Sequence, residues 1–111
     1  MPGYIPKSGD YVTLSFDPQA GHEQQGRRPA LVISNDTFNR HTGFSIVCPI
    51  TRTKRDYPFH LALEGETGIE GYVMIEQVKS IDYRARDARR IGKASSSLLS
   101  EVLARLDACI Y

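Results

Sequence analysis

A short polar segment near the N-terminus concentrates side chains that can move protons and bind anions. Between Gly21 and an apolar run it carries an imidazole, a carboxylate, two amides and two guanidinium groups: His22, Glu23, Gln24, Gln25, Arg27 and Arg28. A carboxylate is ionised at neutral pH and can accept a proton, and a planar guanidinium matches two phosphate oxygens at once. The segment therefore favours acid–base chemistry on a phosphate ester, with Glu23 as candidate base and Arg28 as candidate phosphate ligand.

Two further residues suit the same chemistry. His22 is an acid or base candidate, and Thr51, which follows the apolar run at 44–49, can donate a hydrogen bond to phosphate oxygens. Taken singly, each residue of the loop is better explained by a polar hairpin connection, in which glycines serve backbone geometry and Arg28 pairs with a surface acid. Thr51 alone is explained by strand propensity. Residue types alone leave open whether Glu23, Arg28 or His22 is the base.

The elements expected to position this segment are mostly strands. Val12, Leu14 and Phe16 alternate with polar residues, which is typical of a strand with one buried side. The more continuously apolar runs at 30–33 and 44–48 indicate central strands. At 58–64 the alternation predicts Phe59, Leu61 and Leu63 facing inward and His60 and Glu64 facing outward. Further strands are expected at 72–78, 81–83 and 90–93.

Helices are expected at two places. Residues 35–40 can form a short helix at most, capped by Ser34 or Asn35 and ending near Gly43. At the C-terminus, serines at 95–97 offer N-caps for a helix with one apolar stripe, made of Leu99, Val102, Leu103, Leu106 and Ile110. Many short strands closed by one helix predict a mainly β fold, a strongly bent sheet or small barrel, in a single domain spanning residues 1–111.

The net charge of +1 conceals three basic clusters beside turn signals. They are Arg27 with Arg28; Arg52 with Lys54 and Arg55; and Arg84, Arg86, Arg89, Arg90 and Lys93. Any one cluster is better explained as a solvated loop. Three clusters in one small domain nevertheless predict a shared surface that faces phosphates.

Cysteine and histidine usage predicts neither a metal ion nor another cofactor. His22, His41 and His60 are widely separated, and no paired carboxylates stand at ligand spacing. Cys48 and Cys109 are expected to be small buried side chains in a reducing compartment. The N-terminus lacks the apolar region of a signal peptide, and no stretch approaches the length of a membrane span. A cytoplasmic protein without membrane contact is therefore expected.

Four short segments together resemble the MazF/PemK (Kid) toxin family of bacterial toxin–antitoxin systems. They are Phe16-Asp17-Pro18, the stretch from Gly21 to Val32, Pro49-Ile50-Thr51 and Gln77-Val78-Lys79-Ser80. The resemblance implies the SH3-like barrel shared by MazF, Kid and the gyrase poison CcdB, which periodicity alone does not select. It departs from the family pattern at Arg52, where a second threonine is common, and at Glu76, where the motif usually has aspartate.

The resemblance also implies a function. The family consists of metal-independent, sequence-specific endoribonucleases that cut single-stranded RNA, mainly messenger RNA, leaving a 2′,3′-cyclic phosphate and a 5′-hydroxyl. The residues that the family associates with activity map onto Glu23, Arg28 and Thr51. RNA-binding residues are then expected among the loop and the basic clusters: His22, Gln24, Arg27, Arg52, Lys54, Arg55, Arg84, Arg86, Arg89 and Arg90. Gln77 and Lys79 are expected to be structural or interface residues.

Partners and alternatives follow from the same resemblance. The family is homodimeric and is silenced by a MazE-like antitoxin whose disordered acidic tail lies across the dimer, and basic loops suit such a tail. One alternative is a non-enzymatic gyrase poison like CcdB, but those proteins depend on a C-terminal Trp-Gly-Ile tail and this chain has no tryptophan. Another is a catalytically silent RNA-binding barrel, whose stacking candidates are Tyr57, Phe59, Tyr72 and Tyr83.

Overall fold

The computed structural model describes residues 3–15 and 26–111. Within them the chain forms seven strands, two α-helices and a short 3-10 helix. In chain order these are β1 (Asp10–Ser15), β2 (Arg27–Val32), α1 (Asp36–Thr42), β3 (Phe44–Thr51), β4 (His60–Ala62), β5 (Tyr72–Met74), η2 (Ile75–Gln77), β6 (Lys79–Asp82), β7 (Arg89–Lys93) and α2 (Ser96–Ile110). The predicted mainly β fold with a C-terminal helix is confirmed.

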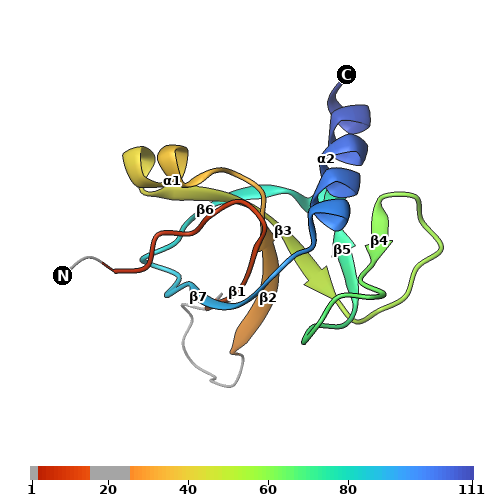
Figure 1. Cartoon of the computed structure of the whole chain (residues 1–111), viewed down its shortest axis with the longest axis horizontal. Coiled ribbons are helices and arrows are strands. Elements are labelled where there is room, and N and C mark those ends of the chain that lie inside the picture. The colour runs from red at the N-terminus through yellow and green to blue at the C-terminus, as the bar shows by residue number, and fades with distance from the viewer. Residues whose placement is uncertain (1–2, 16–25) are drawn as a thin grey trace.

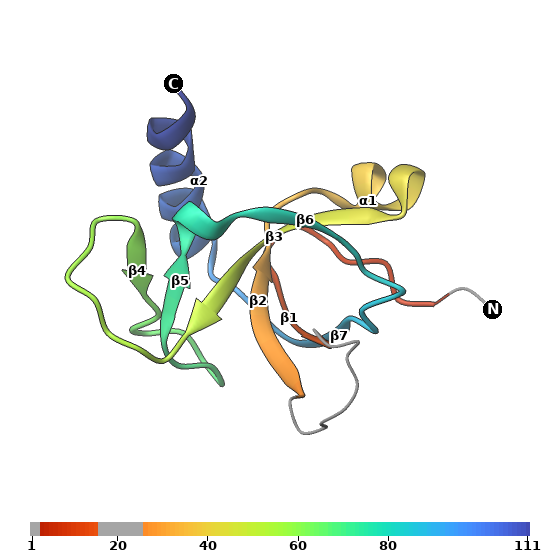
Figure 2. The same ribbon diagram turned by 180° about the vertical axis from the view of Figure 1, so that it is seen from behind.

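The strands make one antiparallel sheet in the order β4-β5-β3-β2-β1-β7, with β6 also paired to β3. One edge of β3 pairs first with β6 and then with β5, because η2 separates those two strands. The sheet is strongly bent, as Figures 1 and 2 show from opposite sides. Among the described residues β4 and β7 do not pair with each other, so the SH3-like barrel is open there.

Both faces of the bent sheet are covered, which explains the continuous apolar runs in its central strands. Leu31, Cys48 and Ile50 pack with η2 and with α2, whereas Val32 and Val47 pack with β6 and the segment that follows it. In β1, Val12 and Leu14 share one face as predicted, but Tyr11 on the other face is buried too, so the strand does not have a single buried side. Phe16, the third residue of the predicted alternation, lies outside the described residues. Central strands buried on both faces lose the simple inside–outside alternation of an edge strand.

The helix ends follow the predicted capping. The Asn35 side chain accepts a hydrogen bond from the Phe38 amide, and Gly43 ends α1 in the left-handed conformation. Ser95 caps α2 by accepting from the Leu98 amide. Of the expected apolar stripe, Val102 is buried and Leu99 and Leu106 are partly buried, whereas Leu103 and Ile110 are exposed. Leu98, which was not expected in that stripe, is buried as well. In Figure 1, α2 stands over β5 at the opposite end of the sheet from α1.

Several expectations from the sequence were wrong in detail. The strand expected at 58–64 covers only His60–Ala62, and His60 is buried rather than outward. Its ring contacts Glu76, with 2.9 Å between Nε2 and Oε2, and Tyr57 meets it edge-on. The strand expected at 72–78 ends at Met74 and continues as η2. Cys109 is exposed, unlike Cys48.

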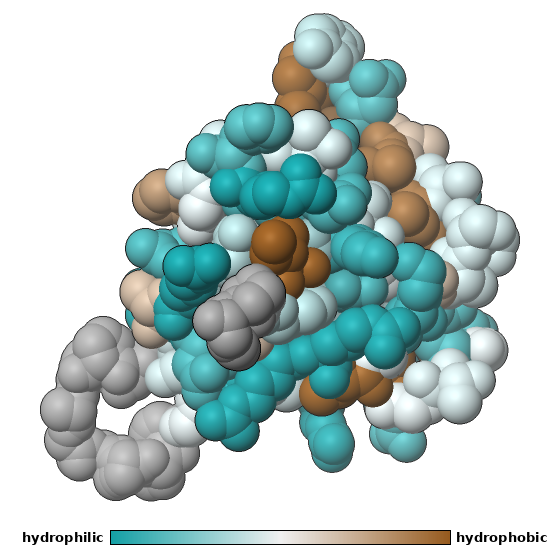
Figure 3. Space-filling model, turned by 60° about the vertical axis from the view of Figure 1, so that its left-hand side comes forward, coloured by the Kyte–Doolittle hydropathy of each residue, from teal (hydrophilic) through white to brown (hydrophobic). Residues whose placement is uncertain are grey.

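The outer surface is mostly hydrophilic, with separate apolar patches, on the face shown in Figure 3. In the described part of the chain, no helix is long and apolar enough to cross a bilayer.

Candidate active site

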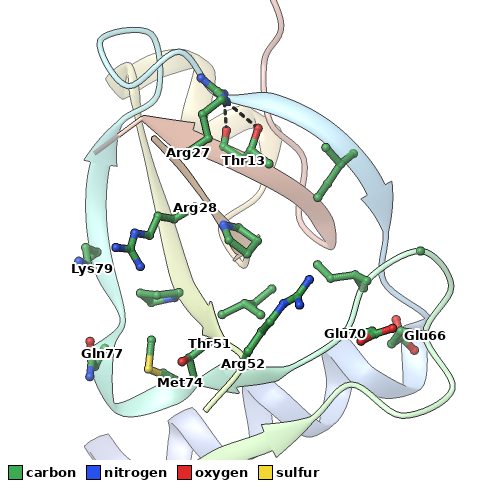
Figure 4. A pocket seen from close by; sticks show the side chains of 16 residues that line it. Thr13, Arg27, Arg28, Thr51, Arg52, Glu66, Glu70, Met74, Gln77 and Lys79 are labelled. Atoms are coloured by element: carbon green, nitrogen blue, oxygen red, sulfur yellow. Dashed lines mark hydrogen bonds between the residues drawn. The ribbon is translucent and has the colours of Figure 1, made fainter. Parts of the chain in front are cut away.

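A large open groove crosses the concave side of the bent sheet. Its volume is about 1190 Å³, and it is lined by residues of β1, β2, β3, β5, β6, β7, η2 and the loop between β4 and β5. Four of the residues singled out from the sequence meet in it: Arg27, Arg28, Thr51 and Arg52 (Figure 4). The groove is therefore the best candidate for the active site.

Arg28 and Thr51 lie just beyond the paired part of β2 and β3. The ladder between these strands runs from Val32–Val47 to Ala30–Pro49 and ends there. Arg28 then pairs with Leu14 of β1, and Thr51 pairs with Tyr72 of β5, so each strand end is held by its other neighbour. Both residues line the groove, which brings together a guanidinium and a hydroxyl from distant parts of the sequence.

Thr51 is positioned to donate a hydrogen bond into the groove. Its Oγ1 accepts a hydrogen bond of 3.1 Å from the Thr53 amide. That contact fixes the hydroxyl oxygen and leaves its proton available to another acceptor. On its other side Thr51 pairs with Tyr72 of β5, so the strand end that carries it is held by the sheet.

The three arginines of the groove differ in whether their guanidinium N–H groups are already hydrogen-bonded to other residues of the protein. Within the described residues, the side chains of Arg28 and Arg52 make no hydrogen bond or ion pair, and both residues are exposed. In Figure 4, Arg28 extends from β2 on the side of Lys79, and Arg52 extends from the end of β3 into the middle of the groove. Their donors are therefore available to an anionic ligand.

Arg27, in contrast, is bound to its own protein. Its Nε donates to Thr13 Oγ1 at 3.0 Å, and one Nη donates to the Thr13 carbonyl at 2.8 Å. The guanidinium also binds the carboxylate and the carbonyl of Asp87, whose φ of 51° lies in the left-handed region. Arg27 thus links β2 to β1 and to the loop before β7. It was expected to bind RNA, but its guanidinium has no pair of adjacent donors free for a phosphate.

The loop between β4 and β5 forms the opposite wall and carries carboxylates. Glu66 accepts hydrogen bonds from the Tyr11 hydroxyl at 2.7 Å and from the Ser95 amide and hydroxyl at 3.0 and 2.8 Å. Burial opposes its ionisation, but these three hydrogen bonds outweigh burial and hold the pKa of Glu66 below its ordinary value of 4.5. Burial, together with Glu66, raises the pKa of Tyr11. Glu66 therefore anchors the loop to the core and to α2.

Sequence reasoning missed part of the groove. Gln77 and Lys79 line it, although they were expected to be structural, and so do Met74, Ile69 and Glu70. Gln77 ends η2 and Lys79 begins β6, so the bend between these elements turns them towards β2. Because residues 72–78 were expected to form one continuous strand, the sequence did not predict that bend. The Gln77-Val78-Lys79-Ser80 motif was the available signal, because it was among the segments that carried the family resemblance.

The remaining basic clusters do not line the groove. Lys54 and Arg55 lie exposed in the connection between β3 and β4. In the other cluster, Arg89 binds Asp87 at 2.7 Å and Arg90 binds the buried Asp10 at 3.3 Å. The sites expected at Arg84 and Arg86 also lie away from the groove lining. His22, Glu23 and Gln24 lie outside the described residues.

The described residues offer neither a cluster of metal ligands nor a reactive buried thiol at Cys48. The described residues hold no group of three or more histidine, cysteine, aspartate or glutamate side chains that could bind a metal ion. Burial raises the pKa of the Cys48 thiol to about 12, which keeps it protonated and unreactive. Positive charge in the groove is supplied by guanidinium groups and Lys79.

Comparison with protein families places these features in a known group. Residues 7–110 match the family described as PemK-like, MazF-like toxin of type II toxin-antitoxin system. The chain is 37% identical over 107 residues to the endoribonuclease toxin MazF of Escherichia coli, covering 96% of each protein. It is 44% identical to the endoribonuclease toxin ChpB of the same organism, covering 92% of this chain and 91% of the relative.

A solved structure agrees with the sequence relatives. The chain superimposes with a TM-score of 0.89 on a chain of the MazE-MazF crystal structure from Deinococcus radiodurans, at 41% identity and with 97% of each chain covered. An endoribonuclease from Mycobacterial species, at 19% identity and a TM-score of 0.79, shares the fold.

Proposed function

The chain belongs to the PemK-like, MazF-like family of type II toxins, and we propose that its groove is the active site of a metal-independent endoribonuclease that cuts single-stranded RNA. The observation that carries the proposal is that Arg28 of β2 and Thr51 of β3 line the same groove, which is large enough for several nucleotides. The relatives named above are endoribonucleases.

The reaction consistent with this site is attack by the ribose 2′-oxygen on the adjacent phosphorus. The 2′-hydroxyl loses its proton to a base, the bond between phosphorus and the 5′-oxygen breaks, and the departing oxygen takes up a proton. The products are a 2′,3′-cyclic phosphate and a 5′-hydroxyl. No oxidant, metal ion or water molecule enters this first step.

The described residues supply the charge-stabilising part of that reaction. As the phosphorus becomes five-coordinate, negative charge grows on its non-bridging oxygens, and a guanidinium with a free donor fork binds two of them. Arg28 has such a fork, and the Thr51 hydroxyl can donate to the same oxygens. Glu23 is the proposed base because a carboxylate is ionised at neutral pH. His22 and Arg28 are the competing candidates for that role.

The biological setting is proposed on the same basis. As the toxin of a toxin–antitoxin pair, the protein cuts messenger RNA in the bacterial cytoplasm, which stops translation and growth. A homodimer and a MazE-like antitoxin with an acidic tail are the proposed partners; the matched Deinococcus radiodurans structure is a MazE-MazF complex. An acidic tail competes with RNA because both are polyanions that bind cationic groups.

The test uses purified protein and a long single-stranded RNA in excess EDTA. We expect cuts at defined sequences, with 5′-hydroxyl ends that a kinase labels directly. Removing one group that stabilises transition-state charge commonly costs about a hundredfold or more in rate, so Arg28→Ala should be nearly inactive. Thr51→Val, which keeps the side-chain shape, should be slower than the wild type.

Arg40→Ala is the matched control, since Arg40 lies exposed on α1 outside the groove and pairs only loosely with Asp36 at 3.7 Å. It should cleave like the wild type. RNA binding without cleavage would identify a silent RNA-binding protein and contradict the proposal. Cleavage that EDTA abolishes and a divalent ion restores would contradict the metal-independent mechanism.

A further inference from the structure

One carboxylate in the groove is used neither by the proposed cleavage nor by the fold. Glu70 lies exposed in the loop between β4 and β5 and lines the same groove as Arg28 and Arg52. Within the described part of the chain it has no hydrogen-bond or ion-pair partner. Figure 4 shows it on the wall opposite Arg28 and Lys79, with Arg52 between the two sides.

The loop that carries Glu70 is held rigidly. Glu66 binds Tyr11 and Ser95 through three hydrogen bonds, and the Leu63 amide donates to the Gly71 carbonyl at 2.9 Å, which closes the base of the loop. Ile69, the residue before Glu70, packs against the core. A carboxylate on such a fixed loop is preorganised for a ligand, because little conformational entropy is lost when the ligand binds.

A carboxylate in this position is unfavourable for phosphate alone. It repels the RNA backbone, so its presence lowers affinity unless it contacts something other than phosphate. A carboxylate accepts hydrogen bonds and donates none. In single-stranded RNA the available donors include the edges of unstacked bases, which are the groups that proteins use for sequence recognition.

Guanine fits these constraints best among the four bases. Its Watson–Crick edge presents the N1 proton and the 2-amino group side by side, so both oxygens of one carboxylate can accept. The adjacent O6 is an acceptor that suits a guanidinium. Uracil presents a single N–H between two carbonyl oxygens, which would face the carboxylate unfavourably. Adenine and cytosine each present one amino group beside an unprotonated ring nitrogen.

We propose that Glu70 and Arg52 form a base subsite selective for guanine in the RNA substrate. Glu70 accepts from N1–H and the 2-amino group, Arg52 donates to O6, and the base lies against the apolar side chain of Ile69. The inference rests on the proposed endoribonuclease function and adds to it a specificity-determining pair. Selectivity of this kind arises from bidentate contact, which favours the right base by about tenfold or more in affinity.

The test measures binding, so that it does not depend on cleavage. The probes are fluorescent seven-nucleotide deoxyuridine strands with one central deoxyguanosine, deoxyinosine or deoxyadenosine, which lack the 2′-hydroxyl needed for cutting. Wild-type protein should bind the guanine strand about tenfold more tightly than the all-uracil strand. Inosine, which lacks only the 2-amino group, should lose a large part of that preference.

Two glutamate variants of the same loop provide the comparison. Glu70→Gln removes the charge in the groove, whereas Glu64→Gln removes an exposed charge outside it. The guanine preference should fall to about threefold or less in Glu70→Gln and stay near tenfold in Glu64→Gln. Both changes are at exposed positions, and a thermal melt for each variant checks that folding is intact.

The outcomes separate the subsite from the cleavage function. A wild-type protein without guanine preference, or a Glu70→Gln variant that keeps it, overturns the subsite. Equal losses in both variants overturn it too, because they would show a general charge effect. A wild type that binds guanine selectively but cuts no RNA supports the subsite and contradicts only the endoribonuclease.

Discussion

Gly71 packs so closely against Thr51 that a Cβ atom on it would lie 2.5 Å from the Thr51 carbonyl oxygen. Its φ of 123° is also one that L side chains rarely adopt. Gly71 precedes β5, and Thr51 pairs with Tyr72 at the start of that strand. The close approach therefore sets the position of the strand end that presents the Thr51 hydroxyl to the groove.

The first prediction is that Gly71→Ala impairs both stability and cleavage, because the new methyl group must displace Thr51 or β5. Gly65→Ala is the control, since Gly65 lies in the same loop outside the groove lining and also has a positive φ, but nothing lies within 4 Å of a Cβ built there. Both variants place a side chain at a positive φ, and only Gly71→Ala adds the clash. Urea unfolding and the cleavage rate of a defined RNA measure the two effects.

The difference between these two variants is the decisive quantity. A misplacement of about 1 Å can cost about a hundredfold in rate, so Gly71→Ala should cut far more slowly than Gly65→Ala. Equal cleavage rates in the two would show that the clash relaxes without moving Thr51.

Residue patterns predicted the strands and caps that depend on local chemistry. Asn35, Gly43 and Ser95 act as helix ends as expected, because capping depends on a residue and its near neighbours. The inward position of His60 did not follow from local alternation, since it depends on Glu76, sixteen residues away. A polar side chain can be buried when a distant partner satisfies one of its ring nitrogens.

The candidate site was also predicted only in part from the sequence. Arg28 and Thr51 were identified from motifs, and the fold brings both into the lining of one groove. Arg27 has the same side chain as its neighbour, yet its partners Thr13 and Asp87 come from β1 and from the loop before β7. Nothing in the local sequence distinguishes a bound arginine from a free one, so the separate roles of these two residues required the fold.

The second prediction tests those separate roles through stability. Arg27→Ala should lower the free energy of unfolding by about 1–2 kcal/mol, because the Thr13 and Asp87 groups lose hydrogen bonds that hold β2 to β1 and to the loop before β7. Arg28→Ala, one residue along the same strand and with the same charge change, should stay within about 0.5 kcal/mol of the wild type. Urea unfolding measures both, and equal losses would refute the assignment of Arg27 as a structural clamp.

The third prediction concerns acid stability and Glu66. Its folded pKa lies below the ordinary value of 4.5, so the ionised form stabilises the fold. This contribution is fully present above that value and is lost as the pH falls through the depressed folded pKa. The stability advantage of the wild type over Glu66→Gln should therefore be largest near neutral pH and shrink towards about pH 3.

Urea unfolding at a series of pH values from about 7 to 3 measures that difference. Glu64→Gln serves as the control, because Glu64 is exposed in the same loop, and its difference from the wild type should vary little with pH. An advantage over Glu66→Gln that stays constant across the series would mean that the Glu66 charge does not stabilise the loop.

The fourth prediction concerns which basic residues bind the RNA backbone. Lys54 and Arg55 are exposed and, within the described residues, have no ion-pair partner, whereas Arg89 and Arg90 are paired with Asp87 and Asp10. A cation already paired to a carboxylate releases fewer counterions when RNA binds. The salt slope is the decrease of the logarithm of RNA affinity with the logarithm of salt concentration, and each phosphate contact to a single strand contributes about 0.7 to it. The double variant Lys54→Gln with Arg55→Gln should therefore reduce that slope by about 1.4.

The double variant Arg89→Gln with Arg90→Gln is the matched comparison, with the same change in charge, and should reduce the slope by less. Affinity for one RNA at several salt concentrations gives both slopes. The cut positions should be the same in both variants, because phosphate contacts position a strand while base contacts specify it. The Lys54 and Arg55 variant should also bind an acidic antitoxin tail more weakly. If the Arg89 and Arg90 variant loses more slope instead, RNA must displace their carboxylate partners, and the backbone path must cross β7 rather than the connection between β3 and β4.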